Sequence, residues 1–317
     1  MPKGQKRVIG FALCGRIVAA ALVVGSLAFW PLAARSSGPS VRVDHNVAYA
    51  TLSPSQTLDL YRPAVNPELA PLVVYIHGGG FRYGDKAGAA NVINPLVRAG
   101  YAVASLDYRL TGEAKYPAQI VDVKAAVRYL RANARQFGLD PRHFAAFGGS
   151  AGGYLATMLG VSAGKRDFAA PALGNTNVSS AVQAVVDWFG PIDLLTIDRQ
   201  RRAQSLCAHI SASARSIAGQ NLFGVQPALV PAKAIAANPI SYIRADTQIP
   251  PMLIEHGTAD CRVPAQQSRD LANALVATGH GSTTRLLLVQ GAGHGPRFGT
   301  SAQMPTVVQF LTRTIPT

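Results

Sequence analysis

Residues 144–159 read FAAFGGSAGGYLATML, and this stretch decides the fold. The short apolar run at 144–147 predicts a buried strand, the glycines around Ser150 predict a sharp turn, and residues 154–159 predict a helix. A serine in this strand–turn–helix context fits the pattern G-x-S-x-G, in which glycines keep the strained turn free of collisions with the strand and the helix. The pattern alone is short, so the rest of the sequence has to decide whether Ser150 is more than an ordinary turn residue.

Similar short runs rich in β-branched and aromatic residues recur along the chain and predict further buried parallel strands. They lie at residues 71–76, 102–106, 182–189, 252–255 and 285–289. Helices are predicted between and after them, at residues 117–137, 266–277 and 306–313. This alternation predicts an α/β fold with a mainly parallel sheet flanked by helices. Residues 191–250 carry no strand signal, so we expect an excursion with short helices that covers a site at the strand ends.

A second glycine motif, His77-Gly78-Gly79-Gly80-Phe81, directly follows the strand predicted at 71–76. A histidine followed by three glycines is expected by chance only about 0.006 times in a chain of this composition. Glycines leave backbone N–H groups open toward a substrate oxygen, so Gly79, Gly80 and Ala151 are the predicted oxyanion hole. A phosphate-binding loop does not fit, because no Lys-Ser/Thr follows the glycines and no G-x-G-x-x-G precedes a helix here.

Two titratable residues lie in loops after predicted strands, Asp260 in HGTAD (256–260) and His294 in GAGHG (291–295). A serine hydroxyl is a weak nucleophile, so it needs an imidazole to take its proton and a carboxylate to orient that imidazole. The chain order Ser150, Asp260, His294 is the order expected for an α/β-hydrolase triad. Neither H-E-x-x-H nor C-x-x-C occurs, and the chemistry requires no diffusible cofactor and no metal.

Composition limits the class of protein. The chain has 317 residues, of which 48% are hydrophobic and 15% charged, and this excludes a disordered tail, a coiled coil and a collagen-like repeat. The formal net charge is +14, but the basic residues are dispersed along the sequence. No basic stripe interleaved with aromatic residues occurs, so nucleic acid is not an expected partner.

The first residues have the pattern of an export signal. Lys3, Lys6 and Arg7 precede a stretch without charge at residues 17–30, which is short for a membrane-spanning helix. We expect residues 1–36 to be a signal peptide or, because the cleavage site is poor, a retained N-terminal membrane anchor through residues 8–34. The catalytic domain is expected at residues 41–317. Either alternative predicts a secreted or periplasmic protein in an oxidising compartment.

The motifs together resemble a family, the α/β-hydrolase esterases with an HGGG motif. The feruloyl/acetylxylan-esterase type, which is related to the hormone-sensitive-lipase-like carboxylesterases, is the most similar. The resemblance runs from about residue 58 to residue 310. Its carriers are LDLYRP (58–63), VVYIHGGGFRYGDK (73–86), DYRL (107–110), YPAQIVDVKAAVRYLRANARQFGLDP (116–141), FGGSAGGYLA (147–156) and HGTADCRVPAQQS (256–268). Phe81 stands where this motif often has Trp. Too few residues lie between the polar linker at 36–40 and LDLYRP for the N-terminal cap of helices found in the hormone-sensitive-lipase type.

The resemblance implies a serine ester hydrolase that cleaves a small-molecule or polymer-borne ester through an acyl-enzyme. It assigns Ser150 as nucleophile, His294 as base and Asp260 as acid, and it implies a disulfide between Cys207 and Cys261. Two separate thiols are the alternative for these cysteines. A peptide or lactone hydrolase on the same triad, or a non-catalytic binding protein of the same fold, are the alternatives for function.

Overall fold

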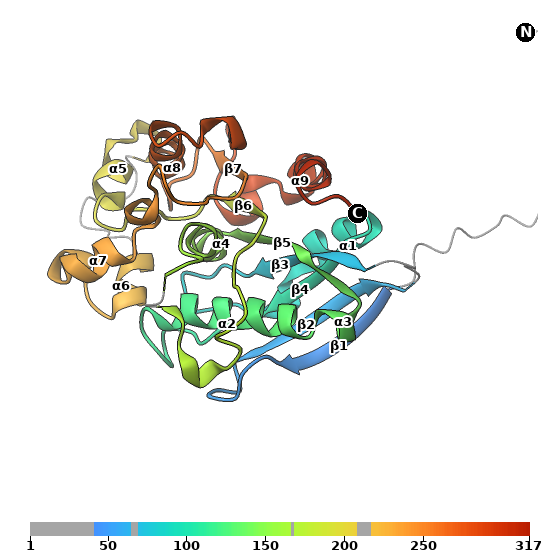
Figure 1. Ribbon diagram of the computed structural model, residues 1–317. Coiled ribbons are helices and arrows are strands. Elements are labelled where there is room, and N and C mark those ends of the chain that lie inside the picture. Colours follow the sequence, from blue (N-terminus) through green and yellow to red (C-terminus); the bar gives the residue numbers. More distant parts are fainter. Residues whose placement is uncertain (1–40, 65–68, 166–167, 208–216) are drawn as a thin grey trace, which may run out of the picture. The chain divides into compact units, whose positions relative to one another are not determined.

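The computed structural model describes residues 41–64, 69–165, 168–207 and 217–317, and they form a sheet between two layers of helices (Figure 1). The predicted leader, residues 1–36, lies outside these ranges. Within the described ranges, we find no helix with the length and apolar character that crossing a membrane requires.

The described residues form one eight-stranded sheet with the order β1-β2-β4-β3-β5-β6-β7-β8. Its strands are β1 (Val41–Ala48), β2 (Thr57–Pro63), β3 (Ala70–Ile76), β4 (Ala102–Leu106), β5 (Leu139–Gly149), β6 (Ala184–Trp188), β7 (Met252–Gly257) and β8 (Thr284–Val289). β2 pairs antiparallel with both β1 and β4, and every other neighbouring pair is parallel. The predicted mainly parallel α/β sheet is therefore confirmed.

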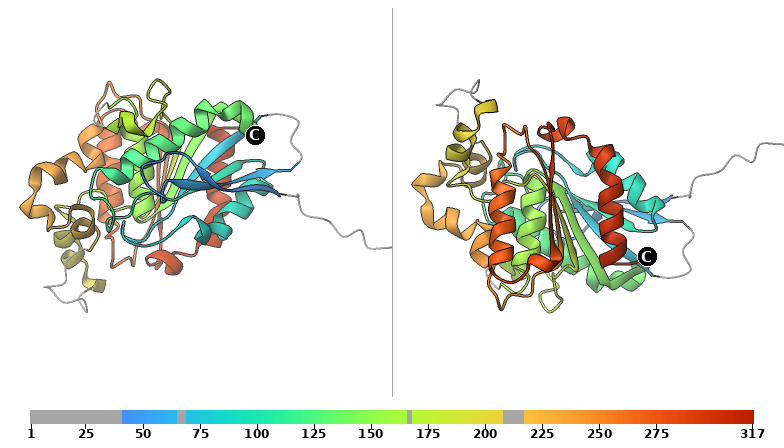
Figure 2. Two further views of the ribbon diagram at one scale, coloured as in Figure 1. Left: turned by 90° about the horizontal axis from the view of Figure 1, so that it is seen from below. Right: turned by 90° about the horizontal axis from the view of Figure 1, so that it is seen from above.

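Helices cover both faces of this sheet (Figure 2). The α-helices of the described residues are α1 (Ala90–Arg98), α2 (Ala118–Ala132), α3 (Ala134–Phe137), α4 (Ala151–Val161), α5 (Ile197–Ala203), α6 (Ile217–Phe223), α7 (Pro231–Ala236), α8 (Gln266–Ala277) and α9 (Thr300–Thr314). Apolar residues of α2, α4 and α8 belong to the core on one face, and those of α1 and α9 belong to the core on the other.

The central strand β3 contributes to both cores because successive side chains of a strand point to opposite faces. Leu72, Val74 and Ile76 pack in the core with α2 and α4, whereas Val73 packs in the core with α1 and α9. Burial on both faces explains why this strand appears in the sequence as a continuous apolar run. The carboxyl ends of such strands are where the glycine motifs begin.

Several helix and strand boundaries, and the burial of one strand, differ from the prediction. The predicted helix at 117–137 is two helices, α2 and α3, which are separated at Asn133. α9 begins at Thr300, six residues before the predicted start, and carries Pro305 in its first two turns. β8 was predicted to be buried, but it is an edge strand with β7 as its one neighbour, and most of its residues are partly exposed.

The excursion predicted at residues 191–250 contains the three short helices α5, α6 and α7, which group at one end of the sheet in every view (Figures 1 and 2). Hydrogen bonds to the rest of the fold fasten it, among them the following two. The hydroxyl of Tyr154 donates to the carbonyl of Ala237 at 2.7 Å, and the amide of Tyr116 donates to the carbonyl of Leu222 at 3.0 Å. We call this segment, as far as it is described, the roof.

Candidate active site

Ser150 occupies the sharp turn between β5 and α4. Its backbone has φ +58° and ψ −123°, a strained conformation for a residue with a side chain, and its amide donates to the carbonyl of Trp188 at 2.8 Å. The neighbouring glycines are required sterically. A Cβ on Gly152 would lie 2.0 Å from the carbonyl oxygen of Ile76, and a Cβ on Gly148 would lie 2.3 Å from the backbone of Gly152. The turn therefore accepts a side chain at Ser150 and none at these two glycines.

The structure brings Ser150, His294 and Asp260 together in a hydrogen-bonded series. Nε2 of His294 is 2.9 Å from Oγ of Ser150, and Nδ1 of His294 is 2.6 Å from Oδ2 of Asp260. The Asp260 side chain is fully buried, whereas that of His294 is 13% exposed and reaches the cavity. This geometry suits proton transfer from the serine hydroxyl to the imidazole, with the carboxylate fixing the imidazole tautomer.

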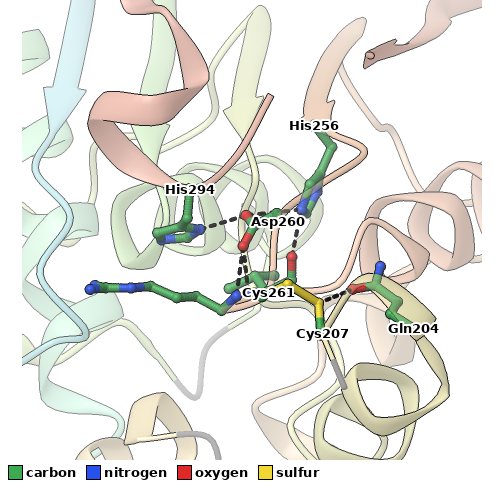
Figure 3. Close-up of a disulfide and its surroundings, with 8 residues drawn as sticks. Gln204, Cys207, His256, Asp260, Cys261 and His294 are labelled. Atoms are coloured by element: carbon green, nitrogen blue, oxygen red, sulfur yellow. Dashed lines mark hydrogen bonds and ion pairs between the residues drawn. A yellow bond between two sulfur atoms is a disulfide. The ribbon is translucent and has the colours of Figure 1, made fainter. Parts of the chain in front are cut away.

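The carboxylate of Asp260 is held from several sides (Figure 3). Its Oδ1 accepts hydrogen bonds from the amides of Arg262 at 2.8 Å and Val263 at 3.0 Å, which leaves Oδ2 for the histidines. Burial alone would raise the pKa of Asp260, but the hydrogen bonds from the His256 and His294 rings outweigh burial and lower this pKa well below its ordinary value. Asp260 is therefore ionised at neutral pH.

His256 is a second histidine beside this carboxylate, and its contact with Asp260 was not predicted. Its Nε2 lies 2.8 Å from the carbonyl of Val263 and 3.4 Å from Oδ2 of Asp260, and its Nδ1 lies 2.7 Å from Oγ of Ser268. Because a carbonyl only accepts, Nε2 carries the proton and donates toward both oxygens. His256 is the first residue of the HGTAD motif. Its position four residues before Asp260 was the feature of the sequence that could have indicated the contact.

The HGGG loop lies beside Ser150. Gly79 has φ +110°, and a Cβ there would lie 2.0 Å from the carbonyl oxygen of Tyr83, so only glycine fits. In the described part of the chain, no backbone or side-chain acceptor takes a hydrogen bond from the amides of Gly79, Gly80 or Ala151. The carbonyl of Gly80 accepts a 2.9 Å hydrogen bond from Nδ2 of Asn221 in the roof. Asn221 thus fixes this loop, and nothing in the sequence of the roof indicated it.

A cavity of about 500 Å³, which we call the main cavity, opens at Ser150. The HGGG glycines, Ser150 and His294 line it together with aromatic residues of the β6 end and residues of α1 and α6. The aromatic residues at the β6 end are Trp188 and Phe189, and the α6 residues are Ile217 and Asn221. The nucleophile, the imidazole and the glycines of the HGGG loop therefore line one space large enough for a small ester.

Trp188 carries an ionisable partner that sequence analysis missed. Its indole Nε1 donates a 2.6 Å hydrogen bond to Oε2 of Glu255, and Glu255 Oε1 has no hydrogen-bond partner among the described residues. Burial raises the pKa of Glu255 to about 7, although the Trp188 hydrogen bond and the charge of Arg285 act in the opposite direction. The only sequence signal was a glutamate inside an otherwise apolar strand.

Cys207 and Cys261 are joined by a disulfide in the structure, with Cα atoms 5.5 Å apart. Cys207 lies in the roof after α5, and Cys261 directly follows Asp260 (Figure 3). The bond therefore links the roof to the loop that holds the carboxylate.

The sequence matches known proteins over most of the described chain. Residues 58–275 match the BD-FAE family. Esterase LipC of Mycobacterium tuberculosis is 31% identical over 76% of this chain and 57% of its own, and esterase LipQ of the same organism is 30% identical over 73% and 52%. The chain thus spans little more than half the length of these curated relatives.

Solved structures of similar fold include esterases. A truncated carbohydrate esterase from gut microbiota superposes with a TM-score of 0.78 at 31% identity and covers 89% of this chain and 99% of its own. Esterase 2 of Thermogutta terrifontis with butyrate bound has a TM-score of 0.63 at 26% identity and covers 87% and 94%. From the fold, the family match and these neighbours, the chain belongs to the BD-FAE family and has the α/β-hydrolase fold.

Proposed function

We propose that this protein is a serine carboxylic ester hydrolase that acts through an acyl-enzyme. The observation that carries the proposal is the series Ser150 Oγ, His294 Nε2, His294 Nδ1, Asp260 Oδ2, with distances of 2.9 and 2.6 Å, at the mouth of a cavity. The esterase names of its relatives support the same reaction class.

The proposed reaction begins when Ser150 Oγ attacks the ester carbonyl carbon and passes its proton to His294 Nε2. The amides of Gly79, Gly80 and Ala151 donate to the oxyanion that forms, and Asp260 stabilises the charged imidazole. His294 then gives the proton to the departing alcohol oxygen, and the acyl group stays on Ser150. Water then attacks the acyl-enzyme carbonyl while His294 takes its proton. His294 passes this proton to Ser150 Oγ as the acid leaves, which restores the free serine.

The test is hydrolysis of p-nitrophenyl acetate and butyrate by the purified protein. Ser150→Ala is expected to lower kcat by about 10⁶-fold while the circular dichroism spectrum stays unchanged. A chelator should leave the wild-type rate unaltered, because no step uses a metal. A Ser150→Ala protein that keeps its activity, or a wild-type protein inactivated by the chelator, would overturn the proposal.

The acyl and alcohol preference is expected to depend on the roof and the main cavity. A panel of acetyl, butyryl, longer-chain and feruloyl esters, with a lactone and a peptide as competing substrate classes, would measure it. We expect short acyl or aromatic esters to be preferred, on a small molecule or a polymer, as the name carbohydrate esterase of one structural neighbour suggests.

We further propose that the protein is exported, on the basis of Lys3, Lys6, Arg7 and the uncharged stretch at 17–30. Expression in a bacterium with the native N-terminus should give protein outside the cytoplasm. Mass spectrometry should find a start near Arg35 or Ser37 if the leader is cleaved and the full chain in the membrane fraction if it is retained. Full-length protein confined to the soluble cytoplasm would contradict both forms.

We also propose that the exported protein carries the Cys207–Cys261 disulfide. Supporting observations are the Cα separation of 5.5 Å and the oxidising compartment that export implies. Thiol counting on unreduced, denatured mature protein should find no free thiol at either position. A free thiol at Cys207 or Cys261 would refute the bond.

A further inference from the structure

A second cavity of about 550 Å³, which we call the side cavity, lies beside His294. It is lined by residues of the loop after β7, of the loop after β8 and of the roof, among them Cys261, Arg262, Arg297 and Leu206. The side cavity shares Arg262, His294 and Gly295 with the main cavity, so the two are adjacent at the imidazole.

The charged residues that line the two cavities are arginines. Arg262 and Arg297 are both exposed, and in the described part of the chain neither guanidinium forms an ion pair or a side-chain hydrogen bond. Among the described lining residues of either cavity there is no aspartate or glutamate. Two unneutralised guanidinium groups in one recess create a positive potential that favours an anion.

The backbones that carry the two arginines are fixed relative to His294. The amide of Arg262 donates to Oδ1 of Asp260 at 2.8 Å, and the preceding Cys261 is joined to the roof. The carbonyl of Arg297 accepts from the amide of Gly293 at 3.1 Å, one residue before His294. The side chains therefore start from positions held by the same contacts that hold the acid and the base.

The reaction chemistry identifies which half of the ester occupies the side cavity. His294 Nε2 must give its proton to the departing alcohol oxygen, so the alcohol part lies against the imidazole. Gly79, Gly80 and Ser150 line the main cavity and not the side cavity. The main cavity therefore holds the acyl carbonyl, and the alcohol part extends past His294 toward Arg262 and Arg297.

We propose that the side cavity binds an anionic group on the alcohol part of the ester, such as the carboxylate of an acylated uronic acid or the sulfate of an acylated sugar. This inference rests on the proposed esterase function and specifies its substrate class. Guanidinium groups bind carboxylate and sulfate oxygens through paired N–H donors, which gives orientation as well as attraction.

The test compares acetyl esters that share one ring and differ in charge. The substrates are the acetylated methyl glycosides of glucuronic acid, glucose and glucose 6-sulfate. For the wild type we expect kcat/KM for an anionic ester to exceed that for the neutral one, and the Arg262→Gln/Arg297→Gln variant should reduce this ratio by about tenfold. The ratio removes any general effect of the substitutions on turnover, and comparison of the two anionic arms identifies the preferred anion. Added salt should lower the wild-type ratio because it screens the attraction.

Arg98→Gln/Arg135→Gln is the matched control, since it removes the same two charges from exposed arginines of α1 and α3 that line neither cavity. It should leave the ratio at the wild-type value. An equal ratio in wild type and in Arg262→Gln/Arg297→Gln would overturn the inference. An equal loss in the control Arg98→Gln/Arg135→Gln would also overturn it, because it would indicate an effect of net charge.

A binding measurement separates this inference from the proposed function. Calorimetry with Ser150→Ala protein and the deacetylated uronic acid glycoside measures binding of the anionic sugar without any turnover. We expect binding that weakens by about tenfold when Arg262 and Arg297 are replaced by glutamine. If the wild type hydrolyses neutral esters but uronate binding does not depend on the arginines, the substrate class is wrong and the esterase proposal stands. If no ester is hydrolysed but arginine-dependent binding is found, the side cavity binds the anion and the esterase proposal is wrong.

Discussion

The indole of Trp188, which lines the main cavity, is hydrogen-bonded at 2.6 Å to the fully buried carboxyl of Glu255. The backbone carbonyl of the same Trp188 accepts the amide hydrogen bond of Ser150. One residue thus joins the nucleophile turn, the cavity wall and an ionisable group in the sheet. Because burial raises the pKa of Glu255 to about 7, the charge at this junction changes near neutral pH.

The first prediction concerns how stability depends on the ionisation of Glu255. The folded protein keeps the carboxyl protonated up to about pH 7, whereas the unfolded chain loses the proton near the ordinary value of 4.5. Between these values the folded state binds more protons, so the free energy of unfolding falls as pH rises. Relative to Glu255→Gln, the wild type should lose about 2 to 3 kcal/mol between pH 5 and pH 8.

Urea denaturation of both proteins at the two pH values measures this difference. Glu255→Gln keeps an oxygen that can accept from Trp188 and cannot ionise, so it is the matched control for shape. Parallel pH profiles for the two proteins would show that Glu255 ionises with the same pKa folded and unfolded.

A second prediction concerns the tautomer of His294. In Asp260→Asn the amides of Arg262 and Val263 should hold the amide oxygen, which turns the NH₂ group toward His294 Nδ1. That nitrogen then accepts instead of donating, and Nε2 carries the proton and can no longer take one from Ser150. We expect kcat to fall by about 10⁴-fold with the fold intact. A fall of less than tenfold in a steady-state assay would exclude the assigned role of Asp260.

A third prediction concerns Asn221, which we regard as a positioning residue for the HGGG loop. Asn221→Ala removes the donor to the Gly80 carbonyl, and Asn221→Asp replaces it with an acceptor that repels that carbonyl. Both should lower kcat by about tenfold or more with a smaller change in KM, because the oxyanion amides act in the transition state. Gln220→Ala changes an exposed neighbour in α6 and should leave both constants unaltered. Equal kinetics in Asn221→Ala and Gln220→Ala would contradict this role.

A fourth prediction concerns the disulfide, which encloses a sequence separation of 54 residues. In the chain-entropy model a loop of this size contributes about 4 kcal/mol, so mild reductant should lower the thermal midpoint. Cys207→Ser should also weaken activity, since the bond fastens the loop that carries Asp260. Reductant should have no further effect on the Cys207→Ser protein, and a second drop in its midpoint would assign the effect to another group.

The sequence allowed the sheet centre and the motif residues to be predicted, because buried parallel strands and glycine turns leave strong local signals. Strands β3 and β4 and helix α8 agree with their predicted ranges to within one residue. β1 was not predicted, since its alternation of apolar and charged residues covers only VRVD (41–44) and most of its residues are exposed. Asn221 and Glu255 were not predicted for another reason: their hydrogen-bond partners, Gly80 and Trp188, are far away in sequence. The two arginines of the side cavity lie in different loops that only folding brings together.

The disulfide also determines what a protease can achieve. Residues between Cys207 and Cys261 include α6, α7 and β7, so this whole segment belongs to a covalently closed loop. Cleavage of one peptide bond inside the loop leaves both fragments attached through sulfur, and a cut between α6 and α7 interrupts none of the paired strands β6, β7 and β8. A molecule cleaved there would migrate as one species in electrophoresis until it is reduced. In a protease-rich environment, its Asp260 and His294 would stay beside Ser150.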